Sequence, residues 1–144
     1  MGCGGIEDME TYNSMPGIQK LLSDFLGGEM NQEKIEGLLK LFPYDSSIIT
    51  DEMIEDRMQI LPLMNPQVLA SMKIPNLEDD LGKITHPMLV FWGMDDKFCP
   101  VSGASKIGQK CHDAQIILFS RCGHWVMIER EEIFNQTCID FLNR

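Results

Sequence analysis

The first half of the chain carries apolar residues at helical spacing. Over residues 17–26, apolar side chains recur every three or four positions, which predicts one buried face of a helix. The same spacing predicts a helix over residues 31–42 and another that begins after Thr50, a favourable N-cap followed by two acidic residues. Asn65-Pro66 predicts the start of a fourth helix, because proline is favoured in the first helical turn.

The second half alternates short apolar runs with helical patterns. Residues 88–92 and 115–119 are largely continuous apolar runs, which are typical of strands buried on both faces of a parallel sheet. Helices are predicted over residues 101–110 and 129–142. A strand–helix–strand–helix order predicts a right-handed crossover and a parallel sheet, so the fold class is α/β.

These patterns divide the chain into three parts. Residues 1–16 are glycine-rich and predict a loop, residues 17–80 predict a helical cap, and residues 81–144 predict the C-terminal part of an α/β core. Two strands alone would leave their edges unpaired. We therefore expect the chain to be part of a larger α/β domain, and to self-associate or bind a partner.

Composition and charge narrow the classes of partner. The 144 residues are 44% apolar, enough for one domain with a core, and the formal net charge is −10. That charge argues against binding nucleic acid or an anionic membrane surface. Apolar runs are too short to span a bilayer, and the N-terminus shows no secretory signal. Five cysteines without a C-x-x-C pair favour reduced thiols in the cytoplasm.

A zinc site would have to draw on the cysteines and histidines near the C-terminal end of the chain. Cys111, His112, Cys122 and His124 are the candidates, but their spacing does not match that of zinc ligands. We therefore expect no zinc site at these residues.

Polar residues follow each predicted strand. Asp95 and Asp96 come after the first strand, and His124 comes after the second. An Asp-Asp pair after a glycine is more often part of a turn, and a lone histidine in a loop is more often solvated or hydrogen-bonded without a function. Adjacent parallel strands place their end loops side by side, however, so an aspartate from one loop can hydrogen-bond a histidine from the next. This is the orienting half of a nucleophile–His–Asp relay.

Two motifs give this pair a family resemblance. F-W-G-M-D-D-K-F-C-P (residues 91–100) and S-R-C-G-H-W (residues 120–125) resemble the C-terminal part of an α/β-hydrolase fold, and more narrowly the meta-cleavage product hydrolases. Those enzymes hydrolyse a carbon–carbon bond in ring-opened dienoates of aromatic catabolism. The resemblance implies that Asp96 and His124 belong to a Ser–His–Asp triad and that Trp125 lies beside a small-molecule dienoate. It also implies that the reaction needs no metal and no organic cofactor.

The resemblance extends upstream. Residues 1–5 (M-G-C-G-G) and residues 44–52 resemble the family's segments before and within the cap. It implies that Arg57 positions the substrate carboxylate, a role suited to a forked guanidinium donor. It also implies that Phe42 and Phe98 line an apolar pocket. From the residues alone, the favoured interpretation of Arg57 is a surface arginine paired with Glu55 or Asp56, and both phenylalanines fit ordinary core packing.

The nucleophile of such a triad is not evident in the chain. Ser14 imitates the family's N-S-M tripeptide, but Tyr12 and Pro16 stand where the nucleophile elbow needs small residues. Cys122 lies too close to His124 along the chain to reach it productively, and the acidic chain does not favour a thiolate. We expect the serine to lie outside these residues and the chain alone to be inactive.

Two alternatives remain open at this point. The first is an esterase or another α/β-hydrolase, which would share Asp96 and His124 without the role of Arg57. The second is a non-catalytic remnant that acts as an interaction module. The family's tryptophan near the end of the cap is missing around Pro75, so the resemblance leaves the choice of substrate undecided.

Overall fold

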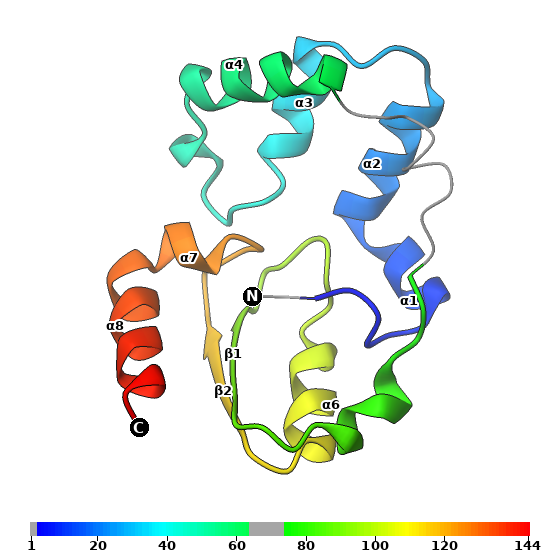
Figure 1. The fold of residues 1–144 in the computed structure, drawn as a ribbon. Coiled ribbons are helices and arrows are strands. Elements are labelled where there is room, and N and C mark those ends of the chain that lie inside the picture. The colour runs from blue at the N-terminus through cyan, green and yellow to red at the C-terminus, as the bar shows by residue number, and fades with distance from the viewer. Residues whose placement is uncertain (1–2, 64–73) are drawn as a thin grey trace.

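The computed structural model describes residues 3–63 and 74–144 as helices around a small sheet (Figure 1). In chain order the elements are α1 (Met9–Ser14), α2 (Pro16–Leu26), α3 (Gln32–Leu39), η1 (Ser46–Ile48), α4 (Asp51–Ile60), η2 (Leu61–Leu63), η3 (Glu78–Lys83), β1 (Met88–Gly93), α6 (Ser102–Lys110), β2 (Ala114–Phe119), α7 (Val126–Glu129) and α8 (Glu131–Leu142). The predicted helix start at Asn65-Pro66 lies outside the described residues.

The two strands of the described sheet run parallel, as predicted. β1 pairs with β2 in a register that runs from Met88 opposite Ala114 to Gly93 opposite Phe119. α6 makes the crossover between them, and α6 and α8 lie on opposite sides of the strands (Figure 1). The C-terminal half of β1 is buried. β2 is only half-buried and Leu118 is 43% exposed, so the expectation that both strands are buried was wrong for β2.

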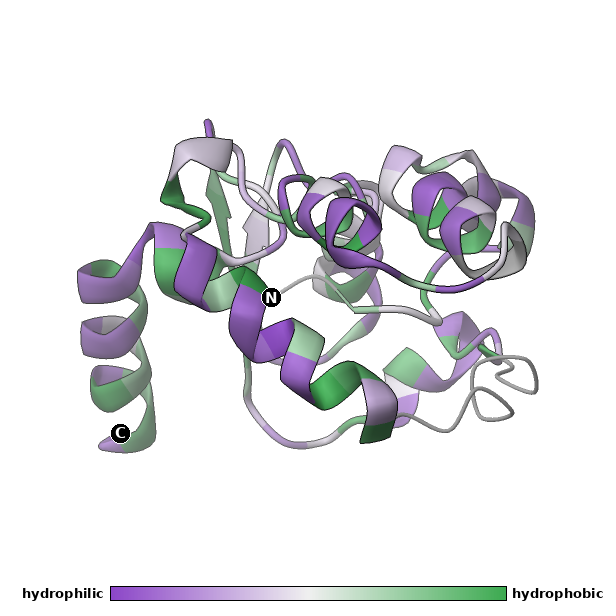
Figure 2. Cartoon of the chain, turned by 90° about the horizontal axis from the view of Figure 1, so that it is seen from above, coloured by the Kyte–Doolittle hydropathy of each residue, from purple (hydrophilic) through white to green (hydrophobic). Residues whose placement is uncertain are grey.

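The main core lies between β1, α6 and the N-terminal helices. Its buried residues include Tyr12, Leu38, Trp92, Phe98, Ala104 and Ile107. A second cluster joins α3 to α4 through Ile35, Leu39 and Ile54. A third holds α7 against β1 through Phe91, Cys122 and Val126. α8 is more loosely attached, because none of its residues is buried. Its apolar residues lie mainly along one side of the helix (Figure 2).

Two local predictions were wrong. Residues 1–16 were expected to form a loop, yet Met9–Ser14 form α1. The Asp8 carboxylate accepts a hydrogen bond from the Thr11 amide at 2.7 Å and caps this helix, and the buried Tyr12 hydroxyl binds the backbone of Ile6. The predicted C-terminal helix is also interrupted, because Arg130 adopts non-helical angles between α7 and α8.

The stretch from Gly5 to Leu77 begins and ends at neighbouring points. The Leu77 amide donates to the Gly5 carbonyl at 2.7 Å. On the core side, the Lys106 ammonium of α6 forms ion pairs with Glu7 and, at 2.9 Å, with Glu78. The two ends are therefore held to each other and to the same helix.

Candidate active site

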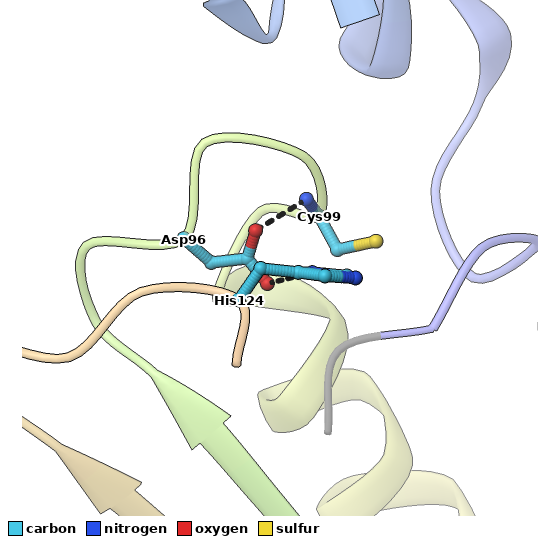
Figure 3. A group of neighbouring side chains, drawn as sticks. All are labelled: Asp96, Cys99 and His124. Atoms are coloured by element: carbon cyan, nitrogen blue, oxygen red, sulfur yellow. Dashed lines mark hydrogen bonds and ion pairs between the residues drawn. The ribbon is translucent and has the colours of Figure 1, made fainter. Parts of the chain in front are cut away.

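The loops after β1 and β2 lie side by side and bring Asp96 and His124 together. His124 Nδ1 lies 2.8 Å from Asp96 Oδ2, within hydrogen-bond distance (Figure 3). The carboxylate side chain is 1% exposed and the imidazole 19% exposed. The structure therefore places the two residues as the strand order predicted, with a buried acid behind a partly accessible base.

Backbone donors fix the Asp96 carboxylate in this orientation. Its Oδ1 accepts hydrogen bonds from the amides of Phe98 at 2.8 Å and Cys99 at 2.9 Å, while Oδ2 faces the imidazole. Because both oxygens are engaged, the carboxylate favours the imidazole tautomer with the proton on Nδ1. The Nε2 lone pair is then available to accept a proton from a nucleophile.

Main-chain contacts also lock the two loops to each other. The Asp95 amide donates to the Cys122 carbonyl at 3.0 Å, and the Met94 amide donates to the Phe119 carbonyl at 2.9 Å. A Cβ at Gly93 would lie only 2.0 Å from the Gly123 carbonyl oxygen. The close approach of the loops therefore requires glycine at position 93.

The His124 loop is held from the helical side as well. The His124 amide donates to the Phe42 carbonyl at 2.7 Å, and the Gly123 amide donates to Glu129 Oε1 at 2.8 Å. A Cβ at Gly123 would lie 2.3 Å from the same Phe42 carbonyl oxygen. The sequence reasoning missed Glu129, since its only signal was an acidic residue soon after the histidine.

The predicted aromatic residues form one layer beside the imidazole. Phe42 stacks on Phe98 with ring centroids 4.1 Å apart, and on Trp125 with centroids 4.8 Å apart. The His124 ring is tilted against Phe42 at 5.6 Å and against Phe98 at 5.4 Å. The structure thus brings Phe42, Phe98 and Trp125 to His124.

Arg57 is not brought to the pair by any direct contact within residues 3–63 and 74–144. It lies exposed on α4, whose residues Ile54 and Met58 belong to the cluster that reaches Phe42 and Trp125. Nor does the described chain pair it with a neighbouring acid.

Asp96, Cys99 and His124 also offer the donor atoms of a possible metal site. One ligand atom from each lies within 4.8 Å of the others (Figure 3). Burial, and then the nearby Asp96 charge, raise the pKa of the Cys99 thiol to about 12, so it stays protonated near neutral pH. A metal would have to remove that proton and displace the hydrogen bonds of Asp96, so the acid–base pair suits this geometry better.

The structure also bears on the two nucleophiles considered from the sequence. Ser14 is exposed at the end of α1 and its hydroxyl donates to the Thr11 carbonyl at 2.7 Å. Burial, followed by the Glu129 charge, raises the pKa of Cys122 to about 12, so this thiol is protonated and weakly nucleophilic. Among the described residues, no serine hydroxyl is hydrogen-bonded to His124.

Comparison with known proteins defines the family. Residues 7–131 match the α/β hydrolase fold family, and the chain belongs to it. Two relatives are each 35% identical over 99% of the chain: a 2-hydroxy-6-oxo-6-phenylhexa-2,4-dienoate hydrolase from Burkholderia cepacia and a 2-hydroxy-6-oxononadienedioate/2-hydroxy-6-oxononatrienedioate hydrolase from Comamonas testosteroni. The meta-cleavage product hydrolase CumD from Pseudomonas fluorescens superimposes with a TM-score of 0.78 at 27% identity over 99% of the chain. The resemblance inferred from the sequence is confirmed.

The matched relatives are longer than this chain. It spans 52% of each of the two hydrolases and 54% of CumD, about half of their length. In the described part of the chain, the helices are too short or too polar to cross a bilayer.

Proposed function

We propose that the chain carries the acid–base half of a hydrolase that cleaves a carbon–carbon bond in a ring-opened aromatic dienoate. The observation that carries this proposal is the 2.8 Å contact between His124 Nδ1 and a buried Asp96 oxygen at the ends of adjacent parallel strands. The names of the relatives supply the substrate class. The serine nucleophile and the groups that bind the oxyanion would come from outside these residues.

The chemistry follows from the two side chains. His124 Nε2 takes the proton from the serine hydroxyl as the serine oxygen attacks the substrate carbonyl, and then delivers that proton to the leaving carbon. Water, deprotonated by the same imidazole, then releases the acyl group from the serine. Asp96 keeps the imidazole in the productive tautomer and stabilises the imidazolium formed in each half of the reaction.

The aromatic layer and Arg57 would set the preference for a dienoate. Phe42, Phe98 and Trp125 form an apolar stack beside His124, and the exposed edge of this stack would suit a planar conjugated chain. Arg57 would bind the terminal carboxylate, and its exposure leaves the guanidinium available for a ligand.

An esterase is the second candidate, because the Asp96–His124 pair makes no demand on the leaving group. An esterase from Exiguobacterium antarcticum superimposes with a TM-score of 0.74 at 16% identity, which is a likeness of fold alone. Comparison of kcat/KM for a dienoate and for a nitrophenyl ester separates the two candidates.

The test requires a nucleophile. We would join the chain to the part of the Burkholderia cepacia relative that it does not match, and follow the bleaching of a yellow dienoate. The chimera should turn over and its His124→Ala variant should not, whereas the 144-residue chain alone should be no faster than its own His124→Ala variant. A folded chimera that bleaches the dienoate equally well with and without His124 would refute the proposal.

The place and assembly of the protein complete the proposal. Five free cysteines suit a reducing compartment, so we assign it to the cytoplasm. The half-buried β2 favours self-association or a covering partner. Light scattering of the purified chain tests this, and a stable monomer would count against it.

A further inference from the structure

Glu129 joins two segments that are far apart in sequence. Its Oε1 accepts a hydrogen bond from the Gly123 amide, and its Oε2 accepts one from the Tyr44 amide, both at 2.8 Å. Gly123 directly precedes His124, while Tyr44 lies in the loop after α3. Both oxygens of one half-buried carboxylate thus accept hydrogen bonds from main-chain amides.

The loop after α3 contacts the His124 loop a second time. The Phe42 carbonyl accepts a hydrogen bond from the His124 amide at 2.7 Å. Gly123 has no space for a Cβ against the backbone of residues 42–44. Glu129 therefore adds a side-chain link to the backbone contact between the His124 loop and the loop after α3.

The neighbouring Arg130 holds the same loop by donating hydrogen bonds to its carbonyls, whereas Glu129 accepts hydrogen bonds from amides. Its guanidinium donates to the carbonyls of Arg121 at 2.7 Å and Ser120 at 3.1 Å. Arg121 has a φ of 54°, a left-handed conformation that costs a non-glycine residue energy. The start of the loop is thus fixed through its carbonyls by Arg130, and its end through an amide by Glu129.

We propose that Glu129 is a positioning residue for His124, which holds the imidazole against Asp96 and couples that position to the loop after α3. The proposal rests on the proposed function only in taking His124 as the acid–base group. Its geometric content, the order of the His124–Asp96 contact, is measurable without turnover.

The variant Glu129→Gln is a sharp test because it preserves the size of the side chain. An amide has one acceptor oxygen, and its NH₂ group opposes the second backbone N–H. One of the two hydrogen bonds is therefore lost. Glu131→Gln removes the same charge from an exposed position two residues away and serves as the matched control.

The readout is the His124 ring N–H signal in the intact chain labelled with ¹⁵N-histidine. We expect its exchange with water to be roughly tenfold faster in Glu129→Gln. Loss of one hydrogen bond between the Glu129 carboxylate and the backbone should let the His124 loop open about that much more often. Glu131→Gln should leave this rate unchanged. In the wild-type chain, the amides of Gly123 and Tyr44 should be protected from exchange.

Two results would overturn the proposal. One is an unchanged His124 ring N–H exchange rate in a folded Glu129→Gln chain, even if the variant unfolds more easily, because that would leave Glu129 a merely structural role. The other is unprotected amides at Gly123 and Tyr44 in the wild type, which decides the matter even if the variant does not fold. If exchange responds as expected but the chimera never cleaves a dienoate, the positioning role stands and the proposed function fails.

Discussion

The α/β part and the α3–α4 pair hold their share of the candidate site by different means. After β1 and β2, backbone hydrogen bonds fix Asp96 through Phe98 and Cys99, and tie the two loops together. α3 and α4 are held by a small apolar cluster of Ile35, Leu39 and Ile54, and Arg57 extends from this pair into solvent.

This difference affects how precisely each part can hold its side chains. Main-chain hydrogen bonds are directional, so they can hold an acid–base pair to within a fraction of an ångström. Apolar packing tolerates changes of size and shape if the volume is kept. Under the proposed function, the α/β part would hold the acid–base pair together with Phe98 and Trp125, and the α3–α4 pair would add Arg57 to substrate recognition.

The largest effect is expected from Asp96→Asn in the chimera. The amide would leave the imidazole without a carboxylate to orient it, and kcat should fall about 10⁴-fold. Asp95→Asn is the matched control, because Asp95 is exposed and its amide, not its carboxylate, ties the loops. The rate of dienoate bleaching checks both, and the reverse order of effects would show that the wrong aspartate has been assigned.

Gly93→Ala tests the close approach of the two loops. The new Cβ would meet backbone atoms of Cys122 and Gly123 that cannot move aside, so the free energy of unfolding should fall by about 3 kcal/mol or more. Gly82→Ala, whose Cβ would lie 3.7 Å from the Lys110 carbonyl, should change it little. Urea denaturation measures both, and equal effects would contradict a special constraint at Gly93.

Phe42→Ala tests the packing of the loop after α3 against Phe98 and Trp125 of the α/β part. The truncation removes the stacking on Phe98 and Trp125, and should cost about 2–3 kcal/mol of unfolding free energy for a half-buried ring. The Phe42 carbonyl and its hydrogen bond from His124 remain. If stability falls but the exchange of the His124 ring N–H is unchanged, the loop after α3 positions His124 through its backbone alone.

Alkaline pH should destabilise the α/β part through its buried thiols. The pKa values of Cys99 and Cys122 are raised to about 12, so above their unfolded value of 9.0 the unfolded chain loses protons that the folded chain keeps. Unfolding free energy should then fall with rising pH, by up to about 1.4 kcal/mol per pH unit for each thiol. Urea denaturation from pH 8 to pH 11 checks the slope, which the double variant Cys99→Ala, Cys122→Ala should flatten.

The smallest effect on stability is expected from Arg57→Ala. Because the side chain is exposed, the free energy of unfolding should change by less than about 0.5 kcal/mol. In the chimera, however, KM for a dienoate should rise about tenfold or more through loss of a charged hydrogen bond. An ester without a carboxylate should show no such change, and equal effects on both substrates would remove Arg57 from carboxylate recognition.

Sequence patterns predicted the parallel strands and the Asp96–His124 pair because both depend on local rules. Apolar runs bounded by Pro87 and Gly93 mark a strand, and loops after neighbouring parallel strands must lie together. The family motifs then supplied the aromatic residues that surround the imidazole.

The missed features depend on contacts between distant segments. Glu129 binds Tyr44 across the fold, and no local pattern distinguishes it from the exposed acids that follow. Similarly, α1 is too short to show a periodic face, and its stability depends on the Asp8 cap and on burial of Tyr12. The exposure of β2 was misjudged because an apolar run predicts a strand but does not show how many strands and helices will cover it.

The hydrogen bond between Gly5 and Leu77 makes the intervening stretch an insertion with a narrow neck. The ends of the insertion meet at two adjacent points, so a change of length away from the contacts that Phe42 and Tyr44 make with the C-terminal part costs little entropy. Lys106 ties both sides of the neck to α6, so the ends of the insertion keep their place when its exposed parts change. Segments of the insertion away from Phe42 and Tyr44 can then change without disturbing the contacts that hold His124.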